Sequence, residues 1–182
     1  MISFAKYIVE VKAEPYPYKW NKLTYSDANA EFITSNGSII VYDVELHYED
    51  AGYGMDEFEH HEIVFRGGKK GSLTTDKIDT GNPFRVFATI EALTKEFIDR
   101  FGNRIEMIKF SAAKGDGELG RSNLYKRFGK NWQKTYPRYN WQPYVLEQSD
   151  KTYLYIVNKD VMSDENKKMI VQSRFRLKLK KL

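Results

Sequence analysis

The sequence predicts an α+β fold, with a mixed, mostly antiparallel sheet and two main helices. Two observations carry this prediction. Residues 30–34 and 39–48 flank the sequence Ser-Asn-Gly-Ser, which is typical of the tight turn of a β-hairpin. Residues 83–101 repeat apolar side chains at spacings of three and four, which is typical of a helix that buries one face. Because strands and helices alternate along the chain, the helices should pack on one sheet as a layered sandwich.

The chain up to the hairpin predicts one strand and a long loop. Residues 2–12 are rich in β-branched and aromatic residues and predict a first strand. Residues 13–29 combine Pro, Tyr, Lys, Asn and Asp, so we expect a loop there, with room for a short helix. Residues 30–34 then begin the hairpin, whose Asn-Gly pair tolerates the positive φ angles of a tight turn.

The second hairpin strand has the clearest alternation in the chain. Its even-numbered residues from Ile40 to Tyr48 are apolar or aromatic, and most of the residues between them are polar. A period of two places one face of the strand in the core and the other in water. With a further strand over about residues 59–66, these segments predict an antiparallel meander.

The strongest helix signal follows a glycine-rich loop at residues 67–81. Asn82 can cap the free amides of a first turn, and Pro83 suits the first helical position. Gly102 stands just after the last apolar residue of the stripe, where a left-handed residue often ends a helix. These features predict a helix that starts at the Asn-Pro pair and stops at the glycine.

The second half of the chain predicts a central strand, a helix and a second hairpin. Residues 105–110 form a short, largely apolar run that suits a central strand. Residues 121–136 predict a helix, and residues 144–148 and 152–158 predict two strands joined by a turn. A helix between the meander and the central strand requires a crossover connection.

The composition is that of a globular chain. It has 182 residues, 41% of them hydrophobic, which is enough for a single domain over residues 1–169 with a basic strand or tail over residues 170–182. The lack of cysteine excludes a disulfide scaffold, a Cys-based zinc site and a cysteine nucleophile. No apolar run approaches about 18 residues and the N-terminus lacks the order of a signal peptide, so we expect a cytoplasmic protein without a membrane partner.

The net charge of +4 conceals a split between two parts of the chain. Residues 1–120 carry a net charge of −6, and residues 121–182 carry +10. No Lys or Arg occurs between Lys22 and Arg66, whereas five basic residues lie in the last nine positions. The basic part could bind a polyanion. The two parts could equally face each other in the fold, or both could be solvated.

The element order and the string Leu-Tyr-Lys-Arg-Phe-Gly at residues 124–129 resemble the GNAT family of N-acetyltransferases. The string matches the Leu-Tyr-x-x-x-Gly core of the helix that follows the central strand in that family. The resemblance covers roughly residues 30–158. It implies a GNAT-like αβα sandwich that binds acetyl-CoA between the strand ending near Arg66 and the strand ending near Ala112, and that transfers the acyl group to an amine.

The resemblance also implies roles for individual residues. Tyr125 matches the tyrosine that protonates the departing thiolate, and Glu62 is a candidate base for the acceptor amine. Gly81, Asn82 and Arg85 stand at the helix start, which the family presents to the cofactor's pyrophosphate. No metal is expected.

These candidates have structural explanations as well. Tyr125 shares an apolar helix stripe with Leu124 and Phe128, and aromatic residues at that spacing often belong to a core. Residues 80–85 read Thr-Gly-Asn-Pro-Phe-Arg and lack the family's glycine-rich pyrophosphate signature, and the proline removes one amide donor. The expectation of acetyltransferase activity in this chain therefore depends on the helix motif and the element order.

The segment Glu-His-His-Glu at residues 59–62 has three interpretations. A Glu or His there could serve as the base that deprotonates the acceptor amine. The segment is less suited to bind a metal ion through both histidines, because His60 and His61 are adjacent and point to opposite faces of a strand. The simplest interpretation is that both histidines are exposed residues of an acidic hairpin.

Three further segments resemble small uncharacterised proteins of tailed bacteriophages. These are residues 80–89, 110–112 and 121–127, with the sequences Thr-Gly before Val-Phe-Ala-Thr, Phe-Ser-Ala and Arg-Ser-x-Leu-Tyr-x-Arg. The resemblance implies a phage protein located in the host cytoplasm or associated with the virion.

An alternative function is binding without catalysis, to nucleic acid or to a host or virion protein. Lys134, Arg138 and Trp141 lie in a segment where aromatic and basic residues alternate, as in surfaces that stack on single-stranded bases. Packing of a loop onto the core explains this segment equally well. The last residues alternate apolar side chains with the cations Arg174, Arg176, Lys178 and Lys180. This tail could be a strand that pairs with a sheet edge or a second copy, or a basic arm for nucleic acid.

Overall fold

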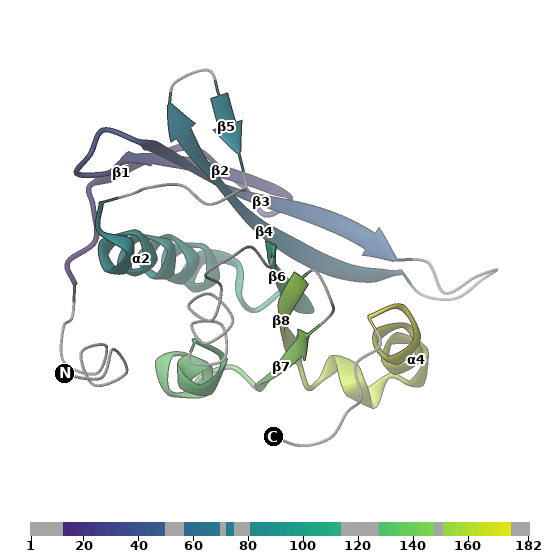
Figure 1. Cartoon of the computed structure of the whole chain (residues 1–182). Coiled ribbons are helices and arrows are strands. Elements are labelled where there is room, and N and C mark those ends of the chain that lie inside the picture. The colour runs from purple at the N-terminus through teal and green to yellow at the C-terminus, as the bar shows by residue number, and fades with distance from the viewer. Residues whose placement is uncertain are drawn as a thin grey trace, which may run out of the picture.

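The structure is a computed structural model that describes residues 13–49, 57–69, 72–74, 81–113, 128–147 and 151–175. It is an α+β fold built on one sheet (Figure 1). The strands are β1 (Tyr18–Leu23), β2 (Asp27–Ile33), β3 (Ile39–Glu49), β4 (Phe58–Lys69), β5 (Ser72–Thr74), β6 (Met107–Ala113), β7 (Trp141–Glu147) and β8 (Lys151–Asn158). The helices are α2 (Pro83–Phe101), the helical residues 128–135, the 3₁₀ turn η1 (Val161–Ser163) and α4 (Glu165–Arg174). The strand expected at residues 2–12 lies outside the described residues.

The strand order across the sheet is β1-β2-β3-β4-β6-β8-β7, with β5 paired to β4. Every described pair is antiparallel except β4 and β6. Those two strands run parallel because α2 carries the chain from one to the other, as a crossover requires. The expected mixed, mostly antiparallel sheet, its meander, its central strand and its C-terminal hairpin are confirmed.

The β2–β3 hairpin follows the predicted pattern. Gly37 has a φ of +80°, which L-residues with side chains rarely adopt, and the Thr34 amide donates to the Ser38 carbonyl across the turn. Ile40, Tyr42 and Val44 are buried, as the alternation predicts. The pattern weakens toward the far end of β3, where Tyr48 is 57% exposed because the β3–β4 hairpin extends past its neighbours (Figure 1).

The loop expected at residues 13–29 is wrong from Tyr18 onward, where the structure has β1 and the start of β2. β1 is an edge strand with little buried surface, so its own pattern is weak. Contacts distant in sequence hold it: Tyr18 Oη and Trp20 Nε1 each donate to the Glu96 carboxylate of α2 at 2.6 Å. A local sequence window contains none of these contacts. Residues 67–81 were likewise expected to form a loop, but β4 extends to Lys69 and β5 follows.

Helix α2 begins and ends where its sequence predicts. The Asn82 side chain accepts a hydrogen bond from the Arg85 amide at 3.2 Å, and Pro83 occupies the first turn. The expected left-handed conformation at Gly102 is wrong, since its φ is −56°. Glycine is needed there for space: an added Cβ would lie 2.6 Å from the Ile98 carbonyl oxygen and 2.6 Å from the Tyr139 hydroxyl. The close approach of Tyr139 therefore explains this glycine.

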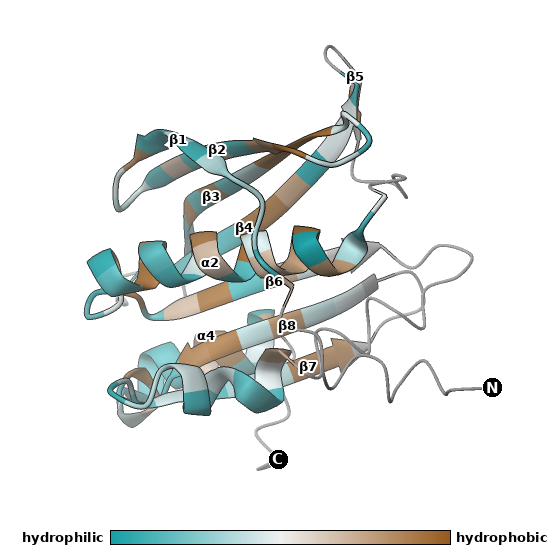
Figure 2. Cartoon of the chain, turned by 90° about the vertical axis from the view of Figure 1, so that its left-hand side faces the viewer, coloured by the Kyte–Doolittle hydropathy of each residue, from teal (hydrophilic) through white to brown (hydrophobic). Residues whose placement is uncertain are grey.

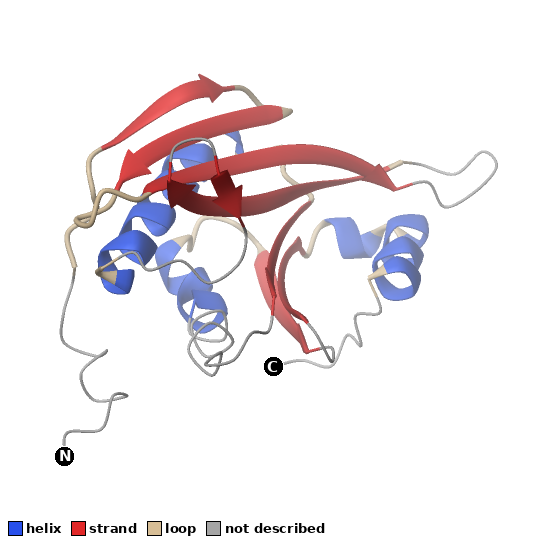
Figure 3. Cartoon of the chain, turned by 45° about the horizontal axis from the view of Figure 1, so that its top comes forward, coloured by secondary structure: helices blue, strands red, loops and turns tan. Residues whose placement is uncertain are grey.

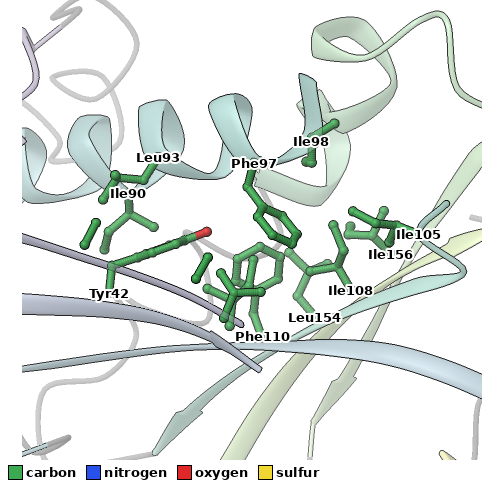
Figure 4. Close-up of a cluster of buried hydrophobic side chains, with 14 of the residues drawn as sticks. Tyr42, Ile90, Leu93, Phe97, Ile98, Ile105, Ile108, Phe110, Leu154 and Ile156 are labelled. Carbon is green, nitrogen blue, oxygen red and sulfur yellow. The ribbon is translucent and has the colours of Figure 1, made fainter. Parts of the chain in front are cut away.

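Two separate cores lie on opposite faces of the sheet. On β8, Leu154 and Ile156 belong to the larger core, whereas Tyr155 and Val157 belong to the smaller one. Helix α2 and residues 128–135 cover the larger core, and α4 covers the smaller one (Figure 3). Figure 4 shows the α2 side chains pointing at those of β3, β6 and β8 in the larger core. In Figure 2, the outward turns of both helices are largely hydrophilic.

The C-terminal region differs from the strand or tail expected at residues 170–182. Residues through Arg174 form helix α4, capped by the Asp164 side chain, which accepts hydrogen bonds from the amides of Asn166 and Lys167. Ile170, Val171 and the following Phe175 are buried in the smaller core. The alternation from residue 174 onward suggested a strand, but its first apolar residue instead ends a helix. Residues 176–182 lie outside the described residues.

Within the part of the chain that the structure describes, no helix is both long and apolar enough to cross a membrane.

The expected helix at residues 121–136 is helical over 128–135, and its first residues lie outside the described ranges.

Candidate functional site

The candidate site is the place where β4 and β6 separate. Their parallel pairing covers only three rungs, His61–Ile108, Glu62–Lys109 and Ile63–Phe110. Beyond it, β4 continues along β3, and β6 continues along β8. Among the described residues, positions 64–66 of β4 pair with no strand on the β6 side. From Gly67 onward, that side of β4 pairs with β5. We call this opening the β4–β6 fork; Figure 3 shows β6 and β8 leaving the direction of the β1–β4 strands there.

Glu62, the predicted base, lies in the middle rung next to the fork. Lys109 Nζ donates to Glu62 Oε2 at 2.9 Å, and Ser111 Oγ lies 3.4 Å from Glu62 Oε1. The two charged side chains are each 20% exposed. Lys109 Nζ also lies 5.9 Å from the ring centroid of Tyr153 on β8. The fork thus carries a half-buried carboxylate–ammonium pair beside a hydroxyl and an aromatic ring.

His60 lies on the same face of β4 and separates this pair from α4. It is 3% exposed, stacks on His47 of β3 with ring centroids 5.2 Å apart, and meets the edge of Phe175 at 5.1 Å. Burial lowers the pKa of His60 to about 4, with smaller contributions from His47 and Lys109. His60 is therefore neutral at pH 7. Within the described residues its Nδ1 has no hydrogen-bond partner.

His61 points to the opposite face, as adjacent strand residues must, and is fully buried against Tyr25 and Phe97. Its Nε2 lies 2.8 Å from the Tyr25 carbonyl oxygen, which only accepts, so Nε2 carries the proton. Burial lowers the pKa of His61. The expectation that both histidines are exposed is wrong, because α2 covers one and Phe175 covers the other. No group of three potential metal ligands occurs among the described residues.

The predicted cofactor residues Gly81, Asn82 and Arg85 lie at the start of α2, beside the β2–β3 turn. A Cβ at Gly81 would lie 2.9 Å from Ser35 Oγ of that turn. Arg85 donates to the carbonyl oxygens of Glu14 at 3.0 Å and Pro15 at 3.3 Å. Since Asn82 accepts from the Arg85 amide and a proline lacks an amide hydrogen, the first turn already uses part of its capacity to bind an anion.

Tyr125, the predicted acid, lies outside the described residues. The glycine of the same motif, Gly129, is described and buried. A Cβ added there would lie 3.1 Å from Leu154 Cδ1 and 3.3 Å from Pro143 Cβ, tighter than ordinary contacts. The motif's glycine thus lets this helix approach the β7–β8 hairpin.

The nucleic-acid candidates Lys134, Arg138 and Trp141 differ in exposure. Trp141 is 2% exposed and packs in the larger core, with its ring 4.5 Å from that of Tyr139. Its ring is therefore covered in the fold, as the packing interpretation of this segment expects. Lys134 is exposed, and Arg138 donates to Asp99 at 2.8 Å.

The basic C-terminal part meets the acidic strands where the structure describes it. Phe175 packs on Phe58 and His60 of β4, and Lys167 Nζ donates to Glu106 at the entry to β6. This arrangement agrees with the interpretation that the two charged parts face each other in the fold. Arg174 is an exposed residue at the end of α4. The candidates Arg176, Lys178 and Lys180 lie outside the described residues.

Sequence reasoning missed Lys109, Ser111 and Tyr153, which surround Glu62. The available signal was the single lysine inside the largely apolar run of residues 105–110, whose one other charged residue is Glu106. A charge at a central strand position needs a partner, but only the strand register identifies that partner as Glu62. No protein-family model, curated protein or solved structure matches this chain.

Proposed function

We propose that this protein has a GNAT-like αβα sandwich and binds acetyl-CoA at the β4–β6 fork, where it transfers the acyl group to an amine. The observation that carries the proposal is the three-rung parallel pair, which opens beside a half-buried glutamate. The element order of meander, α2, β6 and a helix ending its motif at Gly129 also agrees with the resemblance.

The fork suits a ligand that carries amide groups. Backbone N–H and C=O groups along a strand edge need hydrogen-bond partners. An extended pantetheine arm has amides of its own and can pair with positions 64–66 of β4 as an added strand would. The pyrophosphate would then lie toward Gly81 and Asn82. Arg85 contacts it only after releasing the carbonyl oxygens of Glu14 and Pro15.

The chemistry assigned to the residues is a direct transfer. Glu62 accepts a proton from the acceptor amine as the amine nitrogen bonds to the thioester carbonyl carbon. The carbon–sulfur bond breaks, and Tyr125 donates a proton to the departing thiolate. The products are an amide and free coenzyme A, so no metal or redox partner is required.

Calorimetric titration with acetyl-CoA tests the binding step, and a thiol reagent that detects released coenzyme A tests turnover. We expect saturable binding, with Tyr125→Phe retaining affinity but lowering turnover by about 10²-fold. The matched control is Tyr139→Phe, a tyrosine away from the fork. Lack of heat with acetyl-CoA at high micromolar concentration would refute the proposal.

Binding without catalysis remains the second candidate, supported by the net charge of +10 over residues 121–182. Contacts to phosphate must weaken steeply with salt. Measurement of single-stranded DNA and RNA affinity at two salt concentrations, with and without residues 176–182, tests this candidate. Unchanged affinity after the truncation would exclude the tail as the binding segment.

A further inference from the structure

Lys109 is an alkylamine already held by the candidate base. Its Nζ donates to Glu62 Oε2 at 2.9 Å, Ser111 Oγ lies on the other carboxylate oxygen, and the Tyr153 ring lies 5.9 Å from the ammonium. A carboxylate, a hydroxyl and an aromatic face are groups that bind alkylammonium ions. The surroundings of Lys109 therefore have the chemistry expected of an amine-acceptor site.

Its position along the strands places this amine next to the fork. Lys109 and Glu62 form the second of the three parallel rungs, and the strands separate after the next one. Neighbouring rungs are about 3.3 Å apart in a parallel sheet. The four-carbon stem of a lysine covers more than that distance, so Nζ can move toward a thioester in the fork while its neighbour Glu62 stays in place.

No other described lysine combines these features. Lys167 and Lys168 are bound to Glu106 and Glu165, and Lys95 is bound to Asp99, all of them away from the fork. His60, the nearest buried base, is neutral at pH 7 and adds no positive charge beside Lys109. An external amine could reach Glu62 only by displacing Lys109.

We propose that Lys109 is itself an acyl acceptor, so that the protein acetylates this lysine in cis. This inference rests on the proposed function. In the step, Glu62 takes one proton from the Nζ ammonium, the neutral nitrogen bonds to the thioester carbonyl carbon, and the carbon–sulfur bond breaks. The nitrogen gives up its second proton to the departing thiolate, which leaves acetyl-lysine, coenzyme A and a protonated Glu62 that returns its proton to water. The modified side chain is uncharged, so it releases Glu62 to act on a second amine.

Mass spectrometry of the full chain after incubation with acetyl-CoA tests the proposal. We expect one added acetyl group, mapped by peptide analysis to Lys109. The rate per molecule should be independent of protein concentration because the reaction is intramolecular. Lys95 is the matched internal control: it is also paired with a carboxylate but is 55% exposed, against 20% for Lys109. Purely chemical acetylation would therefore favour Lys95.

Variants separate the roles of the two residues. Lys109→Arg keeps the positive charge and should abolish the modification, whereas Lys95→Arg should leave it unchanged. Glu62→Gln should lower the rate at Lys109 by about 10²-fold, as expected for loss of a general base, without changing the rate at Lys95.

The outcomes distinguish this inference from the proposed function. If calorimetry shows acetyl-CoA binding but Lys109 stays unmodified, self-acetylation is refuted and the proposed function stands. If acetyl-CoA does not bind, both are refuted. Acetylation that favours Lys95, or whose rate per molecule rises with protein concentration, overturns the assignment of Lys109 as an acceptor in cis.

Discussion

The two faces of the sheet are built differently. The face under α2 is an apolar core in which side chains such as Phe97 and Phe110 are buried among others of their kind. The face under α4 has a smaller apolar cluster, and beside it lie the His47–His60 stack and the Glu62–Lys109 pair. The first face contributes most of the apolar packing, whereas the second holds the buried His60 and the half-buried Glu62–Lys109 pair next to the fork. Function is therefore expected on the face that contributes less to stability.

The largest expected effect comes from breaking the core under α2. Phe97→Ala removes a fully buried ring that contacts His61 and Phe101, and should lower the free energy of unfolding by about 4 kcal/mol. Phe175→Ala removes a ring at the end of α4 that is 7% exposed, and should cost only about 2 kcal/mol because the site can collapse or fill with water. Urea denaturation measures both. Equal losses would mean that the two faces contribute alike.

Acid should weaken the α4 face next. Burial lowers the pKa of His60 in the folded protein from 6.5 to about 4, so the unfolded chain binds this proton more readily. The contribution of His60 to stability is complete above about pH 6.5 and is lost as the pH falls toward 4. Over this range the free energy of unfolding should fall by about 2–3 kcal/mol. His60→Phe keeps an aromatic ring between His47 and Phe175 and should reduce this dependence to the part contributed by His61, whose pKa burial also lowers. Urea titrations at pH 7 and pH 4.5 compare the two proteins.

The same difference explains what the sequence predicts and what it does not. The repeat in α2 and the alternation in β3 are local patterns, so the α2 face could be predicted from them. The fork depends on which residues of β4 and β6 share a rung, and a single lysine in a largely apolar run does not reveal its partner. Glu62 was predicted through a family resemblance, and its neighbours were missed. His60 was expected to be exposed because its cover, Phe175, lies 115 positions away in the sequence.

A smaller effect separates the pair at the fork from an ion pair on the surface. Lys109→Met leaves Glu62 half-buried without its main partner and should cost about 2 kcal/mol. Lys95→Met removes the exposed ion pair that Lys95 forms with Asp99 one helical turn away, and should cost about 0.3–0.5 kcal/mol. A double-mutant cycle with Glu62→Gln isolates the coupling in the first case. A coupling no larger than that of the surface pair would mean that water screens the fork.

The smallest expected effect lies at the rim of the α2 face. Arg138 donates to Asp99 at 2.8 Å, but the two side chains are 58% and 43% exposed. Water screens such a pair, and both side chains lose rotamer freedom to form it, so Arg138→Ala should change the free energy of unfolding by less than about 0.5 kcal/mol. Any loss should shrink further in high salt. A loss above about 1 kcal/mol would instead indicate that the Arg138 guanidinium, whose carbon lies over the Tyr139 ring at 4.8 Å, stabilises the fold through this cation–π contact. The α2 face would then extend to its charged rim, and the contrast with the α4 face would be sharper than burial alone indicates.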